Sequence, residues 1–123
     1  KIEFRHFPLD AAAFNASKIA QCNQLQSLEI LESLYANQQD WVKGKTVIEL
    51  NENLKKFIEE KDYKIDFEKC INDKKIEDFV LNDRIEGTKK FKVNSTPTII
   101  INNKKFDKSL NYKNLKKFLE KLI

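Results

Sequence analysis

The sequence has very few of the residues that interrupt helices, with 2 Gly and 2 Pro among 123 residues. This scarcity favours a helix-rich chain, because both residues belong mainly to turns and helix ends. No apolar run approaches the roughly 20 residues that cross a bilayer as a helix. Met is absent as well, so the chain lacks an initiator residue and we expect it to be a processed product or a fragment.

The residues that are present predict a folded domain with one core. Hydrophobic residues make up 41% of the chain and include 9 Phe, which argues against disorder despite 34% charged residues. The net charge is +4, and residues 89–123 carry ten cations against two anions. A nucleic-acid patch is one interpretation of this excess. We favour a solvated helix face, because every cation after Arg84 is Lys and the aromatic residues have helical core spacing. We therefore expect no nucleic-acid partner.

Hydrophobic periodicity predicts one strand followed by a block of helices. Residues 1–5 alternate apolar and charged side chains like a strand, which Pro8 ends. Asp10 and Asp66 are good helix N-caps, and Thr46 with Glu49 forms a capping-box pattern. The predicted helices cover residues 11–22, 26–37, a segment from 47, a short piece after 66, 73–91 and 111–122. Their expected inner faces include Leu28, Leu31, Leu34 and Tyr35, then Ile76, Phe79, Val80 and Gly87, and finally Tyr112, Leu115, Phe118, Leu119 and Leu122.

A change of period near residue 93 predicts a β-hairpin before the last helix. Residues 98–101 are a β-branched run, and 104–106 suit the return strand. Asn102 and Asn103 fit the tight turn between them, because Asn tolerates positive φ. Pro97 lacks an amide donor and so belongs at the mouth of the strand. Its local pattern alone favours a trans bond, since about 5–6% of X–Pro bonds are cis.

The segment around Pro97 resembles a motif of a known family. Residues 93–104 read Val-Asn-Ser-Thr-Pro-Thr-Ile-Ile-Ile-Asn-Asn-Lys, similar to the V-x-x-T-P-T-φ-φ-φ-N-G-K segment of DsbA-like thiol:disulfide oxidoreductases. Asn103 stands where that family usually has Gly. Four more segments match in order, namely Phe7-Pro8-Leu9, the Ala-rich helix ending at Cys22, Gln39-Asp40-Trp41 and Phe67-Glu68-Lys69-Cys70-Ile71.

The resemblance implies an α/β, helix-rich, thioredoxin-like fold with an inserted α-helical domain, truncated at its N-terminus. Residues 1–10 and 92–123 would form the thioredoxin-like part, and residues 11–91 the insertion. The implied activity is disulfide formation or exchange in exported proteins, in the periplasm or another extracytoplasmic compartment. Implied partners are extended or unfolded cysteine-containing polypeptides and a membrane redox partner, with no cofactor and no metal. Thr96–Pro97 would be a cis peptide, and Ser95, Thr96 and Pro97 would form the wall that receives substrate.

The family's catalytic C-x-x-C has no counterpart in this chain. Its nucleophile is a low-pKa thiolate at a helix N-terminus, whereas Cys22 and Cys70 lie too far apart in sequence for such a motif. We therefore expect the chain alone to be inactive, with its catalytic cysteines preceding Lys1. The alternative is a non-catalytic, thioredoxin-like module that binds peptides or proteins.

Three other residue types have competing interpretations. The two cysteines are either buried free thiols or a structural disulfide, and the oxidising compartment that the resemblance implies favours the disulfide. His6 has no identifiable nucleophilic partner, so we expect a capping or surface role rather than general-base catalysis. Trp41 is expected to pack at a helix junction.

Overall fold

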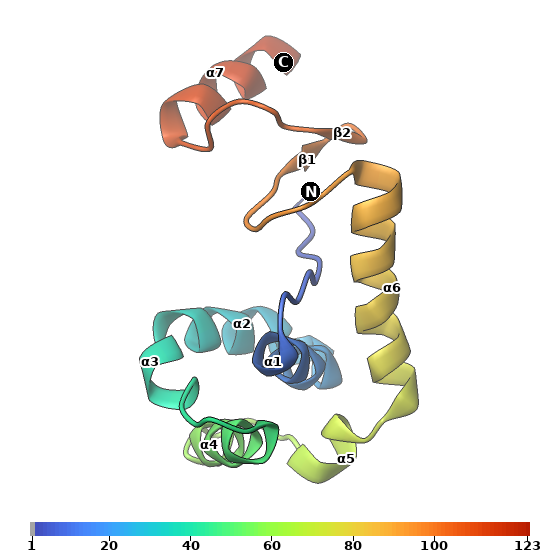
Figure 1. The fold of residues 1–123 in the computed structure, drawn as a ribbon. Helices are drawn as coiled ribbons and strands as arrows, with labels where there is room; N and C mark the ends of the chain where they lie inside the picture. Colours follow the sequence, from blue (N-terminus) through green and yellow to red (C-terminus); the bar gives the residue numbers. More distant parts are fainter. Residues whose placement is uncertain (1) are drawn as a thin grey trace. The chain divides into compact units, whose positions relative to one another are not determined.

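The computed structural model describes residues 2–123, which form two compact units that divide between Ile85 and Glu86 (Figure 1). The first unit contains α1 (Ala11–Cys22), the 3-10 turn η1 (Gln24–Gln26), α2 (Ser27–Ala36), α3 (Gln38–Trp41), α4 (Val47–Glu59), α5 (Phe67–Ile71) and most of α6 (Lys74–Phe91). The second contains the end of α6, the strands β1 (Ile100–Ile101) and β2 (Lys104–Lys105), and α7 (Tyr112–Leu122). The six predicted helices are confirmed, and α3 is an additional short one. The grouping of residues 1–10 with 92–123 in one domain stays a prediction.

Side-chain caps explain where most of these helices begin. The carboxylate of Asp10 accepts a hydrogen bond from the amide of Ala13 at 2.8 Å, and α1 starts at the next residue. Asp66 caps α5 in the same way through the amide of Lys69 at 3.2 Å. These caps satisfy amides that would otherwise lack a partner in the first turn. Both were predicted from sequence.

The start of α4 has a modified capping box. The hydroxyl of Thr46 accepts from the amide of Glu49 at 3.1 Å, as predicted. The carboxylate of Glu49 returns to the amide of Lys45 at 2.6 Å, one residue before the cap. Gly44 permits this, because its φ is +122° and an added Cβ would lie 2.6 Å from the Cβ of Glu49. The predicted loop at Gly44 is therefore fixed by the helix that follows it.

The core of the first unit is built around α1, which packs against α2, α4 and α5. Ala16 and Ala20 give α1 a small inner face, so its neighbours approach closely. Ile19 and Ile30 are fully buried, and Leu54 is nearly so. Between α4 and α5, the ammonium of Lys55 donates to the carboxylate of Glu68 at 3.1 Å, and this hydrogen bond raises the pKa of Lys55.

Three expected inner faces are only partly correct. In α2, Leu34 is buried as expected, but Leu28 and Tyr35 are 50% and 72% exposed and Ile30 takes their place. In α6, Val80 is buried whereas Phe79 is 47% exposed. In α7 no described residue is fully buried, and Leu115 and Phe118 are half-buried. All three differences have the same cause: the apolar stripe on each helix is wider than the face that its neighbours cover.

The expected strand at residues 1–5 is not present. Lys1 lies outside the described residues, and residues 2–9 contain no strand. A strand is defined by its ladder partner, and β1 and β2 pair only with each other within residues 2–123. No helix within these residues combines the length and the apolar character of a membrane-spanning segment.

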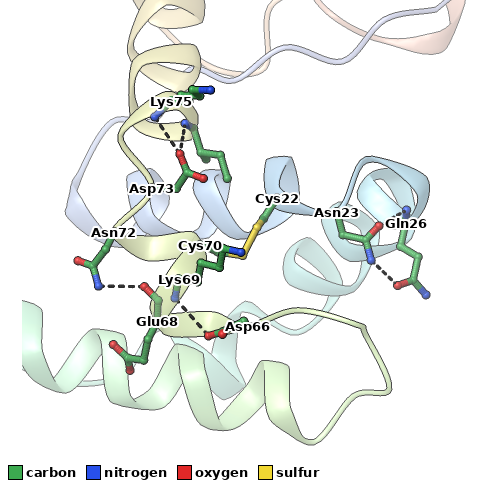
Figure 2. Close-up of a disulfide and its surroundings, with 11 residues drawn as sticks. Cys22, Asn23, Gln26, Asp66, Glu68, Lys69, Cys70, Asn72, Asp73 and Lys75 are labelled. Carbon is green, nitrogen blue, oxygen red and sulfur yellow. Dashed lines mark hydrogen bonds between the residues drawn. A yellow bond between two sulfur atoms is a disulfide. The ribbon is translucent and has the colours of Figure 1, made fainter.

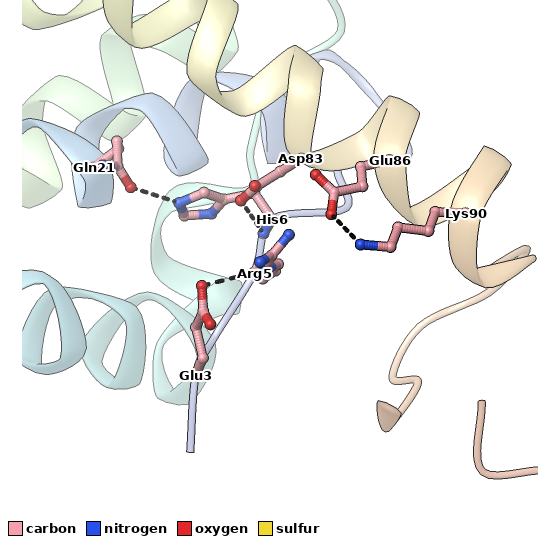
Figure 3. Close-up of polar contacts among 7 residues, drawn as sticks. All are labelled: Glu3, Arg5, His6, Gln21, Asp83, Glu86 and Lys90. Carbon is pink, nitrogen blue, oxygen red and sulfur yellow. Dashed lines mark hydrogen bonds and ion pairs between the residues drawn. The ribbon is translucent and has the colours of Figure 1, made fainter. Parts of the chain in front are cut away.

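The N-terminal segment is held instead by side chains of the first unit (Figure 3). The amide of His6 donates to the carboxylate of Asp83 at 3.1 Å, and its ring Nε2 lies 3.1 Å from the side-chain oxygen of Gln21. The guanidinium of Arg84 donates to the carbonyl of Pro8 at 2.7 Å. His6 is 8% exposed. It is therefore buried, in neither the surface position nor the capping role expected.

Candidate functional site

The loop that contains Ser95, Thr96 and Pro97 follows directly from the end of α6. Lys92 adopts a positive φ of 58° there, which turns the chain out of the helix. The amide of Val93 then donates to the carbonyl of Gly87 at 2.9 Å. The ammonium of Lys105 donates to the carbonyl of Lys92 at 3.2 Å, tying β2 to the loop's start.

A short turn fixes the conformation of the loop itself. The hydroxyl of Thr98 donates to the carbonyl of Ser95 at 2.7 Å and closes the turn around the two residues between them. The Thr96–Pro97 peptide bond is cis. Ser95, Thr96 and Pro97 are all exposed. Within residues 2–123, neither the amide nor the carbonyl of Thr96 has a hydrogen-bond partner. One backbone donor and one acceptor are thus presented to solvent.

The predicted β-hairpin follows this loop directly in the chain. β1 and β2 are antiparallel, with Ile100 opposite Lys105 and Ile101 opposite Lys104. Asn102 and Asn103 both have positive φ, 51° and 66°, as the predicted tight turn requires. The strands are shorter than expected, although the amide of Phe106 donates to the carbonyl of Ile99 at 2.8 Å and extends the pairing.

An aromatic contact joins the hairpin to α7. The rings of Phe106 and Phe118 meet edge to face, with centroids 5.4 Å apart and planes at 80°. Phe106 is therefore both the end of the hairpin and the anchor of the last helix.

A shallow groove of about 320 Å³ lies beside the loop. Its lining combines apolar side chains, two lysines and one aspartate with the loop itself, and includes Ser95, Pro97, Phe106, Lys108 and Leu110. The sequence had indicated the loop residues but not Lys108 or Leu110, which carry no recognisable motif. No cysteine thiol lines the groove.

The two cysteines, whose state the residues alone left open, form a disulfide in the first unit (Figure 2). It joins the last residue of α1, Cys22, to Cys70 in α5, with Cα atoms 5.8 Å apart. Cys70 is 2% exposed. The chain's only two cysteines are thus bonded to each other, and neither is a free thiol.

Acidic, histidine and cysteine side chains form no cluster of three or more that is suitable for a metal ion in the part of the chain that is described. The expected absence of a metal site stays a prediction.

Comparison with known proteins identifies the family. A family model described as thioredoxin matches residues 1–121, nearly the whole chain. No curated protein and no solved structure matches the sequence. With its mostly helical content and small two-stranded sheet, the chain is a helix-rich member of the thioredoxin family.

Proposed function

We propose that this chain forms the substrate-binding part of a DsbA-like thiol:disulfide oxidoreductase, which forms or exchanges disulfides in exported proteins. The thioredoxin family is a family of thiol–disulfide chemistry, and the chain belongs to it over residues 1–121. The observation that carries the finer proposal is the exposed loop at Thr96, which offers a backbone amide and a carbonyl beside Pro97.

Such a loop recognises a polypeptide without reading its sequence. An extended chain can add to exposed backbone groups much as a strand adds to a sheet edge. Each bond of this kind contributes about 0.5–1.5 kcal/mol net. This contribution suits an enzyme that must bind many different unfolded proteins and then release them. The groove lined by Pro97, Phe106 and Leu110 would receive a neighbouring apolar side chain.

The chemical step itself requires a thiol that this chain does not provide. In disulfide exchange, a thiolate attacks one sulfur of a disulfide and the other sulfur leaves as a thiolate. The two cysteines here are bonded to each other, and Cys70 is buried. In the proposal the reactive C-x-x-C comes from outside this sequence, while Ser95, Thr96 and Pro97 hold the substrate.

The proposal includes a compartment and partners. Substrates are extended or unfolded polypeptides that contain cysteine, and a membrane redox partner restores the oxidised state. An extracytoplasmic, periplasmic location fits the Cys22–Cys70 cystine, because structural disulfides persist mainly in oxidising compartments.

The role of the Thr96 backbone can be tested with two substitutions at one position. Thr96→Pro removes the amide donor, whereas Thr96→Ala removes the side chain and keeps the donor. We expect Thr96→Pro to weaken binding of an extended peptide with one S-methylated cysteine by roughly threefold to tenfold, as one lost hydrogen bond predicts. Thr96→Ala should leave the affinity unchanged. Nuclear magnetic resonance titration of the 123-residue chain measures both, and equal losses in the two variants would contradict a backbone role.

A non-catalytic peptide-binding module is the second candidate function. It is favoured by the bonding of both cysteines to each other, which leaves the chain without a free thiol. The two functions differ in one feature, because a C-x-x-C in polypeptide preceding Lys1 favours the enzyme and its absence favours the binding module.

Either function predicts that the 123-residue chain alone does not reduce insulin disulfides, since it lacks a C-x-x-C. The expected rate of insulin precipitation in dithiothreitol is that of buffer. Turnover above buffer, abolished by Cys22→Ala, would instead place a redox centre at the cystine.

A further inference from the structure

We propose that a second groove, on the first unit, is a docking site for an acidic peptide segment that carries a large apolar side chain. This groove has a volume of about 720 Å³ and is lined by the end of α1, η1, Lys64 and the first turns of α6. All of its lining residues belong to the first unit. The proposal does not depend on disulfide chemistry or on the loop at Thr96.

Apolar side chains in this groove are unusually open to water. Leu25, in η1, is fully exposed, and Phe79, in α6, is 47% exposed. Ile76 lies one turn before Phe79 and is half-buried. Single exposed apolar residues are ordinary, but several that line one concave surface indicate a site for a partner's apolar group.

The charge of the groove specifies the partner further. Lys64 and Lys75 line it, and no carboxylate does. Both lysines are exposed, and within residues 2–123 neither ammonium has an ion pair or hydrogen bond. The neighbouring Lys74, by contrast, pairs with Asp78 at 2.9 Å. The groove therefore presents two ammonium groups that have no ion-pair partner, which attract carboxylates and raise their local concentration.

The groove lining excludes the acidic residues nearest in sequence to the two lysines, namely Asp62, Asp66, Asp73 and Glu77. The carboxylate of Asp78, one turn after Lys75 in α6, is paired with the ammonium of Lys74. The carboxylate of Asp73 accepts from the amides of Lys75 and Ile76 at 2.9 and 3.3 Å, at the start of α6 (Figure 2). The carboxylate of Asp73 therefore caps α6 through backbone amides and does not pair with the ammonium of Lys75.

The wall of the groove is fixed before any partner binds. Cys22 lines it and is cross-linked to Cys70 in α5. The side chain of Asn23 is held by Gln26, with its amide nitrogen 2.8 Å from that residue's side-chain oxygen (Figure 2). Gln24 is exposed, and its side-chain amide has no hydrogen-bond partner within the described residues, so that amide can bind a peptide backbone. A preformed wall reduces the entropy lost on binding.

Two fluorescent peptides of equal length test the proposal on the 123-residue chain. One carries a Leu-Phe pair flanked by Asp and Glu, and the other carries the same pair flanked by Lys. We expect the acidic peptide to bind at least about tenfold more tightly in low salt, and the difference to shrink as screening increases. Fluorescence anisotropy measures both affinities.

A charge-reversed variant and a matched control locate the effect. Lys64→Glu with Lys75→Glu should weaken the acidic peptide by about tenfold or more. Lys43→Glu with Lys45→Glu makes the same change in net charge on exposed residues that do not line the groove, and should change the affinity less than about twofold at moderate salt. Leu25→Ser should weaken both peptides, and its full exposure leaves the fold intact. Circular dichroism checks folding of each variant.

Four results would overturn the proposal. The first two are equal affinity for the two peptides and an equal loss of affinity for the acidic peptide in the two double variants. The third is that the acidic peptide changes nuclear magnetic resonance amide shifts only in residues 95–110. The fourth is that an oligothymidine displaces the acidic peptide as well as an unlabelled acidic peptide does. The last would show a general anion surface without selectivity for a peptide.

Discussion

Replacing Cys22 and Cys70 by Ala together should lower the free energy of unfolding by about 4 kcal/mol. The two residues are 48 positions apart in the sequence. A cross-link that closes a loop of this length removes chain entropy and so raises the free energy of the unfolded state by about that much in the chain-entropy model. α5 has only five residues, too few to form a stable helix in isolation. The cross-link to α1 therefore holds a segment that has little stability of its own.

Guanidinium unfolding without reductant measures this loss. The control is the unsubstituted chain unfolded in excess dithiothreitol, which removes the cross-link and keeps both sulfur atoms in the core. We expect the reduced chain to lose nearly as much stability as the double variant. A loss below about 1 kcal/mol in both would show that the cystine contributes little. A large loss in the variant alone would assign the effect to packing at Cys70.

Trp41→Ala should lower the free energy of unfolding by about 3–5 kcal/mol, because the substitution leaves a large cavity in the core. Trp41 is 6% exposed, and its indole N–H donates to the carbonyl of Leu34 at 2.9 Å. This bond joins α3 to α2, so the side chain packs at a helix junction as the sequence predicted. Trp41→Phe keeps much of the ring but leaves the buried carbonyl with one donor fewer, and should cost about 1–3 kcal/mol.

Far-ultraviolet circular dichroism in guanidinium is the measurement, since Trp41 is the chain's one tryptophan and its fluorescence is lost with it. Tyr35→Ala is the matched control, because Tyr35 is an aromatic residue of the adjacent helix that is 72% exposed. It should change stability by less than about 0.5 kcal/mol. Similar losses of unfolding free energy for Trp41→Ala and Tyr35→Ala would contradict the burial of Trp41 in the core.

The helix starts and the hairpin turn were predictable because the interactions that define them are local. Asp10, Thr46 and Asp66 each cap an amide three residues ahead. Asn102 and Asn103 need only their own backbone conformation to make a tight turn. Ser95, Thr96 and Pro97 were found by resemblance to a motif, and the structure adds their exposure and the Thr98 bond that closes the turn.

Contacts between distant residues were decided only by the tertiary structure. The sequence predicted that Leu28 and Tyr35 lie on the inner face of α2, but in the structure α1 packs against α2 and Ile30 is the buried residue. Hydrophobic periodicity identifies an apolar stripe on a helix but not which part of it a neighbouring helix covers. The residues alone left the state of Cys22 and Cys70 open and only the resemblance favoured a disulfide, since a disulfide depends on the approach of two separate helices. Likewise, the groove with Lys64 and Lys75 joins three separate segments of the chain. Local sequence determined the elements and their ends, whereas packing between them decided which faces are buried, which cysteines meet and where a partner can bind.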